Sequence, residues 1–266
     1  MTDVLVLLPP SEAKTEPATG PRLDLAAMSL PALRPARRRT LTALVRLARG
    51  DLETARTTLK LSPGQVDEVR RDATLRAAPT APAAEVYSGV LFGALDAASL
   101  PPAARARLDA WVLVWSGLWG AVRLSDPIPA YRLSGAVSLP GLGPLAAHWR
   151  PALARALRPL ADVEGQVVLD LRSGTYTGSW TPSGPRGLTV RVVQEQAGTR
   201  TVASHANKAA KGRLVRSLAL ALADQPDPCT PDELLDVLRA AGHRLEPGPR
   251  GTTAGPRVVD VVVEAL

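Results

Sequence analysis

Residues 4 to 10 read Val4-Leu5-Val6-Leu7-Leu8-Pro9-Pro10 and are the firmest guide to how this 266-residue chain folds. Five apolar residues in a row, ended by two prolines, predict a buried β-strand. The polar loop Ser11-Glu12-Ala13-Lys14-Thr15 follows at the end of that strand, where functional side chains are often found. We therefore expect a core strand that carries a functional loop at its end.

Other segments on either side of this strand have the length and pattern of strands or helices. Strands are expected at 111–115, 166–172 and 257–264, with a hairpin formed by 188–193 and 199–204. Helices are expected at 36–61 with a break at Gly50, and at 65–76, 145–160, 207–222 and 231–241. Because strands and helices mix without strict alternation, we expect a single α+β domain over residues 1–266, built on a mixed sheet with surrounding helices.

The charge of the chain favours a polyanionic partner. Its 32 Lys and Arg residues against 25 Asp and Glu residues give a net charge of +7. Such a balance favours binding to nucleic acid, nucleotides or anionic surfaces. The richness in arginine is also typical of proteins from GC-rich genomes, so the charge alone leaves both interpretations open.

Cysteine and histidine usage argues against disulfide and metal chemistry. Cys229 is the only cysteine, which excludes a disulfide framework and a multi-cysteine metal site. His148, His205 and His243 lie far apart and lack the spacing of metal ligands. We therefore predict no metal and no cofactor. The chain also has no apolar segment near the ~20 residues of a membrane span and no signal peptide, so we expect a cytoplasmic protein without a membrane partner.

Only four of the basic residues are lysines rather than arginines: Lys14, Lys60, Lys208 and Lys211. Lysine is a compact charge whose pKa can be tuned, whereas arginine stays charged. Lys208 and Lys211 precede the apolar residues of the 207–222 helix at spacings of three and four, which predicts that both turn toward the interior. Near a helix start such lysines suit a bound anion, and Asn207, the only asparagine, adjoins them. The alternative is that both lysines are simply solvated.

A helical hairpin is expected near residues 51–76. Ser62-Pro63-Gly64-Gln65 combines a capping serine, a proline suited to the first helical position and a glutamine that completes a capping box. Such a hairpin can present backbone N–H groups and basic side chains to phosphates without reading bases. Its basic residues are Arg56, Lys60, Arg70, Arg71 and Arg76. The alternative is a plain helical hairpin with a solvated basic face.

The three tyrosines lie in segments that contain glycine and serine, so we expect them in loops and outside the core: Tyr87, Tyr131 and Tyr176. In that position they can stack on bases or donate hydrogen bonds to an anion. The alternative is that they anchor their loops against the core.

Several short segments together resemble one known family. They are Ser11-Glu12-Ala13-Lys14-Thr15, Val86-Tyr87-Ser88-Gly89, Ser116-Gly117-Leu118-Trp119-Gly120-Ala121-Val122-Arg123, Asp126 with Tyr131-Arg132-Leu133, Leu171-Arg172-Ser173 with Tyr176, and Lys208-Ala209-Ala210-Lys211-Gly212. In order over nearly the whole chain, they are similar to the signature segments of the YaaA family of peroxide-stress proteins. The chain departs from that family at Glu12, Ala130 and Ala209, where the family has proline, proline and lysine.

The resemblance implies a rounded mixed α/β fold with a deep basic cleft. It also implies DNA binding through a helix-hairpin-helix element, here near 51–76, and a role in limiting damage from peroxide and unincorporated iron. The residues expected to line the cleft and bind an anion or DNA are Ser11, Lys14, Thr15, Tyr87, Ser116, Arg123, Tyr131, Arg132, Ser173, Tyr176, Asn207, Lys208 and Lys211.

Two functions of different kinds follow. The first is a monomeric, non-enzymatic protein that binds double-stranded DNA largely without sequence specificity, with an affinity that falls steeply as salt rises. The second is an enzyme acting on a nucleotide or another small anionic substrate. In it, Lys14, Lys208 and Arg132 bind the anion, and a lysine or tyrosine acts as acid or base. A scaffold protein whose charge reflects genome composition is the third interpretation.

Overall fold

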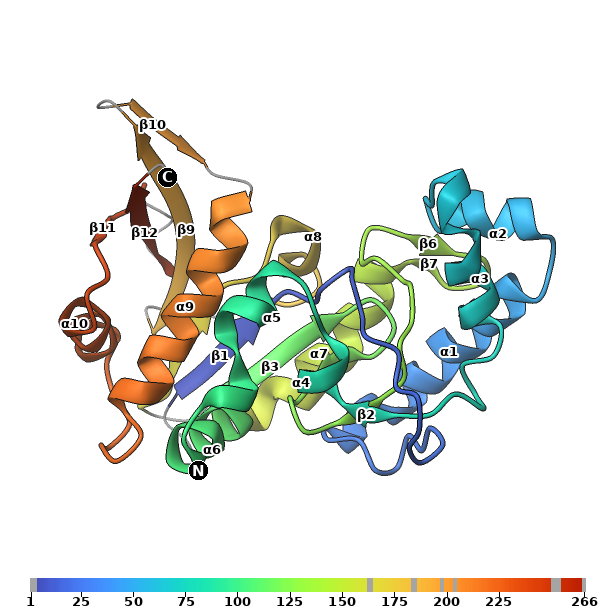
Figure 1. Cartoon of the computed structure of the whole chain (residues 1–266), viewed down its shortest axis with the longest axis horizontal. Coiled ribbons are helices and arrows are strands. Elements are labelled where there is room, and N and C mark those ends of the chain that lie inside the picture. Colours follow the sequence, from blue (N-terminus) through green and yellow to red (C-terminus); the bar gives the residue numbers. More distant parts are fainter. Residues whose placement is uncertain are drawn as a thin grey trace.

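A mixed eight-stranded sheet forms the centre of the protein (Figure 1). The computed structural model describes residues 4–161, 165–182, 186–196, 199–202, 205–249 and 255–264. In spatial order the strands are β11 (Leu245–Pro247), β12 (Arg257–Glu264), β9 (Gly187–Gln196), β8 (Val167–Asp170), β1 (Val4–Leu8), β3 (Val112–Ser116) and β4 (Gly120–Val122), and β10 (Thr199–Val202) pairs with β9. Strands β12 to β3 are parallel, whereas β4, β10 and β11 are antiparallel to their neighbours. The predicted mixed sheet and the predicted hairpin at β9 and β10 are confirmed.

Strand β1 lies between β8 and β3, and all five of its residues are buried. It runs parallel to both neighbours, with Leu7 opposite Asp170 and Leu8 opposite Val114. Because the carboxyl ends of parallel strands meet at one edge of a sheet, the loop after β1 lies beside the ends of β3 and β8. In open α/β sheets this edge is where ligands bind, and it gathers most of the polar residues described below.

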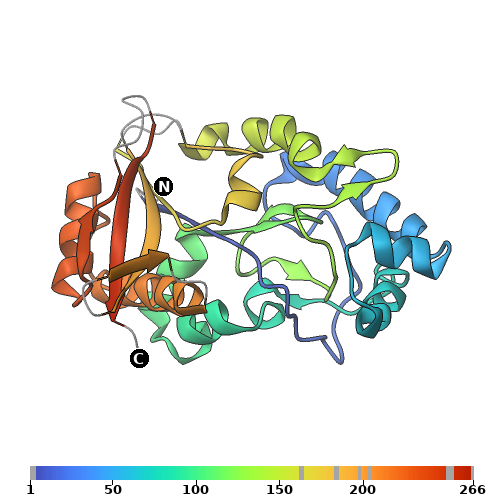
Figure 2. The ribbon, with the colours of Figure 1, turned by 90° about the horizontal axis from the view of Figure 1, so that it is seen from above.

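Helices pack around the sheet and extend the molecule on one side (Figures 1 and 2). At that end α1 (Arg34–Ala48), α2 (Leu52–Thr58) and α3 (Val66–Asp72) pack on one another. Next to the sheet, α5 (Val90–Leu95) and α9 (His205–Ala221) form the most extensive helix–helix contact. The other helices are α4 (Ala83–Val86), α6 (Pro102–Trp111), α7 (Leu145–Ala161), α8 (Gly174–Thr177) and α10 (Pro231–Ala240).

Short elements complete the fold. Three-residue 3-10 helices span Pro31–Leu33, Pro63–Gln65 and Ala97–Ser99, and two-residue strands are β2 (Ala81–Pro82), β5 (Pro127–Ile128), β6 (Ser138–Leu139) and β7 (Gly143–Pro144). Among the described residues, no helix combines the length and apolar character that crossing a membrane requires.

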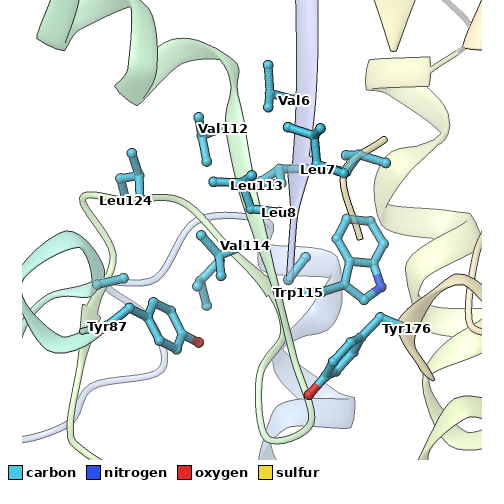
Figure 3. Packing of buried hydrophobic residues seen from close by; sticks show 14 of the residues in the cluster. Val6, Leu7, Leu8, Tyr87, Val112, Leu113, Val114, Trp115, Leu124 and Tyr176 are labelled. Carbon is cyan, nitrogen blue, oxygen red and sulfur yellow. The ribbon is translucent and has the colours of Figure 1, made fainter. Parts of the chain in front are cut away.

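The core is one cluster that includes β1, β3 and several large aromatic rings (Figure 3). The largest buried side chains include Trp111, Trp115 and Trp119. All three tyrosines are also buried, with exposed fractions of 2%, 1% and 7% for Tyr87, Tyr131 and Tyr176. The expectation that they lie outside the core is therefore wrong. Their hydroxyl groups have hydrogen-bond partners inside the protein, which allows the rings to be buried without an unsatisfied polar group.

The helical hairpin consists of α2, the 3-10 turn Pro63–Gln65 and α3. Asp51 caps α2 by accepting a hydrogen bond from the N–H group of Thr54 at 2.8 Å. The Gln65 side chain accepts one from the N–H group of Ser62 at 3.0 Å, as a capping box requires. Helix α3 ends at Asp72 instead of continuing to about Arg76, because turns follow it.

Candidate functional site

The loop after β1 is held against the segment that precedes α5. Lys14 and Tyr87 form an isolated antiparallel bridge, and the Thr15 N–H group donates to the Val86 carbonyl at 2.8 Å. Gly89 has a φ of +92°, and a Cβ atom there would lie 3.0 Å from the Ser11 hydroxyl oxygen. The close approach of the two segments therefore depends on glycine. The fold thus brings together the predicted residues Ser11, Lys14, Thr15 and Tyr87.

Lys14 has an unusual environment for a lysine. The residue is half-buried, and its Nζ donates a hydrogen bond to the Ser11 carbonyl at 2.8 Å. Nζ also lies 4.2 Å from the centre of the Tyr131 ring and 5.5 Å from that of Tyr87. Burial of the ammonium group lowers the pKa of Lys14 from 10.5 to about 8, against the opposing charge of Glu12. At pH 7 roughly a tenth of the amine is therefore uncharged.

Asp72, at the end of α3, is the partner that we did not predict from the sequence. Its side chain is fully buried; Oδ1 accepts a hydrogen bond from the Arg132 N–H group at 2.9 Å, and among the described residues Oδ2 has no hydrogen-bond partner. Burial raises the pKa of this carboxyl from 3.8 to about 8, and the nearby charge of Lys14 opposes the shift. Asp72 could have been found from the pattern, because it lies three residues after Val69 and three before Leu75, which are both buried.

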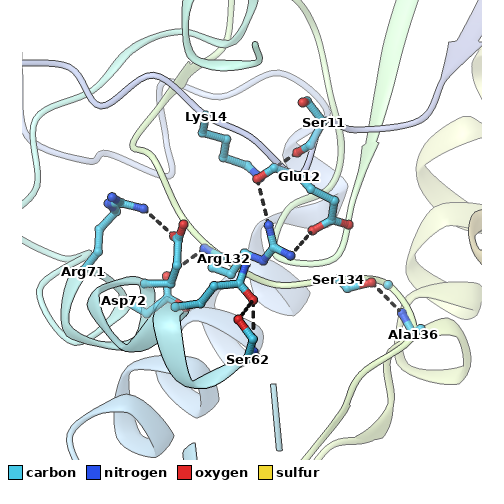
Figure 4. A network of polar contacts seen from close by, with 12 residues as sticks. Ser11, Glu12, Lys14, Ser62, Arg71, Asp72, Arg132, Ser134 and Ala136 are labelled. Atoms are coloured by element: carbon cyan, nitrogen blue, oxygen red, sulfur yellow. Dashed lines mark hydrogen bonds and ion pairs between the residues drawn. The ribbon is translucent and has the colours of Figure 1, made fainter. Parts of the chain in front are cut away.

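Arg132 and Glu12 complete the cluster around these two groups (Figure 4). The Arg132 guanidinium donates to the Glu12 carbonyl at 3.1 Å and forms an ion pair with its carboxylate at 3.2 Å. Glu12 stands where the family that the sequence resembles has proline, so this chain supplies Arg132 with a local counter-ion. We call Lys14, Asp72, Glu12 and Arg132 the lysine–aspartate site.

A chain of hydroxyl groups fixes the ring beneath Lys14. The Tyr87 and Tyr131 hydroxyl oxygens are 2.8 Å apart, and the Ser116 hydroxyl lies 2.6 Å from that of Tyr131. Ser116 Oγ also accepts a hydrogen bond from the Trp119 N–H group at 2.9 Å. Burial raises the pKa of both tyrosines, so they stay protonated and position Lys14. Tyr176 reaches the same region: its hydroxyl accepts from the Gly135 N–H group at 3.2 Å, and burial raises its pKa to about 12.

A second cluster lies at the end of β8 and consists of Asp170, Arg172 and Lys211. Both oxygens of Asp170 accept hydrogen bonds from the Arg172 guanidinium, at 2.9 and 2.6 Å. Lys211 on α9 is buried as predicted; burial lowers its pKa, and the charge of Asp170 opposes the shift. Asn207, one turn earlier, has a buried Oδ1 that finds no hydrogen-bond partner in the part of the chain that the structure describes.

Three of the predicted residues lie elsewhere or point differently. Lys208 is exposed, so the prediction that it turns inward is wrong: among residues 207–221 of α9, the first buried one is Ala210. Ser173 is exposed at the start of α8. The Arg123 guanidinium donates to the Ala110 carbonyl, just before β3 begins, whereas Ser116 lies at the end of that strand. Five strand residues span roughly 16 Å, so Arg123 lies away from the lysine–aspartate site.

The hairpin cations are paired within the protein. Arg56 contacts Glu53, Arg70 contacts Asp67 and Arg71 contacts both Glu68 and Glu16. The two remaining cations donate hydrogen bonds to neutral oxygen atoms. Lys60 donates to the Ala136 carbonyl at 3.0 Å, and Arg76 donates to the Thr42 hydroxyl at 2.7 Å. A phosphate group would have to replace these partners.

Helix α1 carries arginines of a different kind. Arg38, Arg39 and Arg46 are exposed, and within the described residues none of them has a hydrogen bond or an ion pair. They line a groove of about 730 Å³ together with residues 140–142 and the N-terminal part of α2. We call this the arginine groove. Sequence reasoning missed it, although the helical spacing of residues 38, 39 and 46 places them on one polar face of the predicted helix.

Comparison with known proteins identifies the family. The profile of the family described as peroxide stress protein YaaA matches residues 4–247. The chain belongs to this family. The UPF0246 protein SCO2297 of Streptomyces coelicolor is 48% identical over 266 residues, covering 99% of this chain and 100% of that protein. The UPF0246 protein CE1889 of Corynebacterium efficiens is 41% identical over 248 residues, covering 91% and 95%.

Membership of the YaaA family supports a role in the response to oxidative stress. It confirms the resemblance drawn from the short segments of the sequence. In the part of the chain that the structure describes, His, Cys, Asp and Glu residues form no group of three that could hold a metal ion.

Proposed function

We propose that this YaaA-family protein binds duplex DNA, largely without regard to sequence, during the response to peroxide. The observation that carries the proposal is the arginine groove beside the helical hairpin. Its three arginines have no partner among the described residues, so a phosphate group can bind them without first breaking an ion pair. Phosphate contacts of this kind fix a protein on a duplex but carry no sequence information.

The dimensions of α1 suit a nucleic-acid backbone. Residues 38 and 46 are eight positions apart, which corresponds to roughly 12 Å along a helix. One strand of a duplex presents about three phosphates over that length. The hairpin then contributes mainly its shape and backbone N–H groups, because its side-chain cations already have partners. The hairpin cations remain predicted DNA contacts that add less to the affinity than the arginine groove does: Arg56, Lys60, Arg70, Arg71 and Arg76.

A salt titration of duplex binding tests this proposal. We expect the logarithm of the binding constant to fall linearly with the logarithm of salt concentration. In the triple variant Arg38→Ala/Arg39→Ala/Arg46→Ala, the slope should become shallower by up to about 2.7, at roughly 0.9 for each lost phosphate contact. The matched control Arg70→Ala/Arg71→Ala removes paired cations and should change the slope by less than about 1. The proposal fails if wild-type protein does not bind DNA at low salt, or if the triple variant keeps the wild-type slope.

The lysine–aspartate site favours a second function, an enzyme acting on a nucleotide or another small anionic substrate. A DNA-backbone clamp has no need for an unpartnered, fully buried carboxyl oxygen at Asp72 beside a lysine with a lowered pKa. Such groups are typical of acid–base or nucleophilic catalysis. Thermal unfolding in the presence of nucleotides and sugar phosphates tests for a ligand, which should raise the melting temperature of the wild type but not of Asp72→Asn.

A further inference from the structure

Lys14 has the surroundings of a reactive amine. Its Nζ makes one hydrogen bond, to the neutral Ser11 carbonyl, and the described residues provide no carboxylate within ion-pair distance. Charged groups that act on it from neighbouring elements are Glu12, Glu68, Asp72 and Arg132. A lysine that is desolvated and not ion-paired can lose its proton and act as a nucleophile toward carbonyl carbon.

Asp72 has the surroundings of a proton donor and acceptor. Its Oδ1 is fixed by the Arg132 N–H group, while Oδ2 has no partner even though the residue is fully buried. A buried polar atom without a partner is costly and is rare in folded proteins. Retaining it where the charge of Lys14 acts on it is understandable if Oδ2 receives a bound molecule or exchanges a proton with one.

We propose that Lys14 forms an imine with an aldehyde and that Asp72 is the acid–base group of this reaction. The aldehyde with the best fit to a protein of the peroxide response is the open-chain deoxyribose that remains where DNA has lost its base. That choice of substrate rests on the proposed DNA binding, whereas the reactivity of Lys14 does not.

The reaction balances with these two residues alone. The lone pair of the uncharged Lys14 nitrogen attacks the aldehyde carbon, a C–N bond forms, and the carbonyl oxygen takes up the proton that the nitrogen loses. The protonated Asp72 then gives its proton to the resulting hydroxyl group, which leaves as water. An iminium cation and the Asp72 carboxylate remain, so charge is conserved and no other reactant is required.

The site is suited to that product. The Tyr131 ring faces Lys14 Nζ at 4.2 Å, and an aromatic face stabilises a cation. The Asp72 carboxylate formed in the same step is a nearby counter-ion. Tyr87 and Ser116 hold the ring through hydroxyl contacts, and Lys14 as a residue is half-buried.

Reductive trapping tests the proposal. Purified protein is incubated with sodium cyanoborohydride, which converts an imine into a stable secondary amine, and either a duplex with one abasic site or 2-deoxyribose 5-phosphate. Mass spectrometry of peptides then locates the adduct. Since the chain has only four lysines, Lys14, Lys60, Lys208 and Lys211, the other three act as internal controls. We expect the adduct on Lys14 with both probes.

Two variants separate chemistry from folding. Lys14→Arg keeps the positive charge but has no nucleophilic amine, so the Lys14 adduct should be lost while the circular-dichroism spectrum stays that of the wild type. Asp72→Asn keeps an oxygen for the Arg132 N–H group but cannot transfer a proton, and trapping should slow by at least about a hundredfold. In the wild type, the trapping rate should rise between pH 6 and 8 as Lys14 loses its proton, whose pKa is about 8.

Each outcome has a definite meaning. A Lys14 adduct with the sugar phosphate but not with duplex DNA supports the reactive lysine and contradicts the abasic site as its substrate, whereas DNA binding itself is decided separately by the salt titration. Adducts spread over all four lysines, or undiminished trapping in Lys14→Arg, overturn the proposal. Asp72→Asn with a wild-type rate and a wild-type circular-dichroism spectrum overturns the role of Asp72.

Discussion

Lys14 is half-buried and Lys211 is buried, and each lies near an aspartate at the same edge of the sheet, yet their surroundings differ. Asp170, which acts on Lys211, has both carboxyl oxygens bonded to Arg172, and the Arg172 guanidinium lies 4.1 Å from the Trp115 ring centre. Asp72, which acts on Lys14, has only Oδ1 bonded and only to a backbone N–H group. The Asp170 carboxylate therefore has a partner for each oxygen, while among the described residues the Asp72 carboxyl leaves one oxygen without a partner.

The comparison separates a structural cluster from a reactive one. The Asp170–Arg172 ion pair connects the end of β8 to the segment before α8. A ligand would supply it with no missing hydrogen-bond partner. The lysine–aspartate site is unfavourable for folding, because an unpartnered buried oxygen costs free energy. Such a site persists where a bound molecule supplies the missing partner. The four predictions below test this contrast through stability.

Asp170→Asn should give the largest loss of stability. The Arg172 side chain has no exposed surface, so removing its carboxylate leaves an uncompensated buried charge. We expect the free energy of unfolding to fall by about 3–5 kcal/mol, measured from urea unfolding. The double variant Asp170→Asn/Arg172→Met should recover part of the loss. A loss below about 1 kcal/mol in the single variant would contradict a structural role for this pair.

The pH dependence of stability should reveal the lysine–aspartate site. The pKa of Asp72 is 3.8 when unfolded and about 8 when folded, so the folded state binds the extra proton. Stability therefore falls as pH rises from about 4 to about 8, by a few kcal/mol. The pKa of Lys14 is about 8 when folded and 10.5 when unfolded, so stability rises again from about pH 8 to 10.5.

Asp72→Asn provides the measurement for this second prediction. The difference in free energy of unfolding between wild type and variant, recorded from pH 4 to pH 8, cancels the contributions of groups that the two proteins share. We expect the free energy of unfolding of Asp72→Asn to rise relative to that of the wild type as pH rises. A constant difference across this range would show that the Asp72 carboxyl is ionised at neutral pH in the folded protein.

Gly212→Ala should lower the free energy of unfolding by a smaller amount, and it should affect only the cluster that contains Lys211. A Cβ at Gly212 would lie 2.2 Å from the Leu91 carbonyl oxygen and 2.9 Å from the Ala94 Cβ, which forces α9 away from α5. We expect a loss of about 1–3 kcal/mol. The control is Gly93→Ala on α5, where a Cβ would meet no atom within 4 Å and helix propensity favours alanine. Equal effects of the two substitutions would disprove the close contact.

Local signals in the sequence were sufficient for much of the fold. The strand expected at 257–264 is β12, residue for residue. The helix expected at 231–241 is α10, which Thr230 caps by accepting from the Glu233 N–H group at 3.2 Å. In both cases the deciding interactions lie within a few residues or follow from a continuous apolar pattern, so they can be read from the chain directly.

The incomplete site depends on contacts between distant parts of the chain. Asp72 is fixed by Arg132, 60 residues away, and Arg71 pairs with Glu16, 55 residues away. Spacing along one helix shows that Asp72 is buried but not that its Oδ2 lacks a partner. The tyrosines were misplaced for the same reason, because a hydroxyl contact such as that between Tyr87 and Tyr131, 44 residues apart, depends on tertiary structure.

The smallest effect is expected at Lys208, which shares α9 with Lys211 but is exposed. Lys208→Met removes a solvated charge, and the free energy of unfolding should change by less than about 0.5 kcal/mol. Lys208 and Lys211 are three positions apart, so helical spacing alone treats them alike. What distinguishes them is packing, since Ala210 is the first buried residue among residues 207–221 of α9. A loss above about 1 kcal/mol in urea unfolding would mean that the interior stripe extends to Lys208, and that a second incomplete lysine site lies at the start of α9.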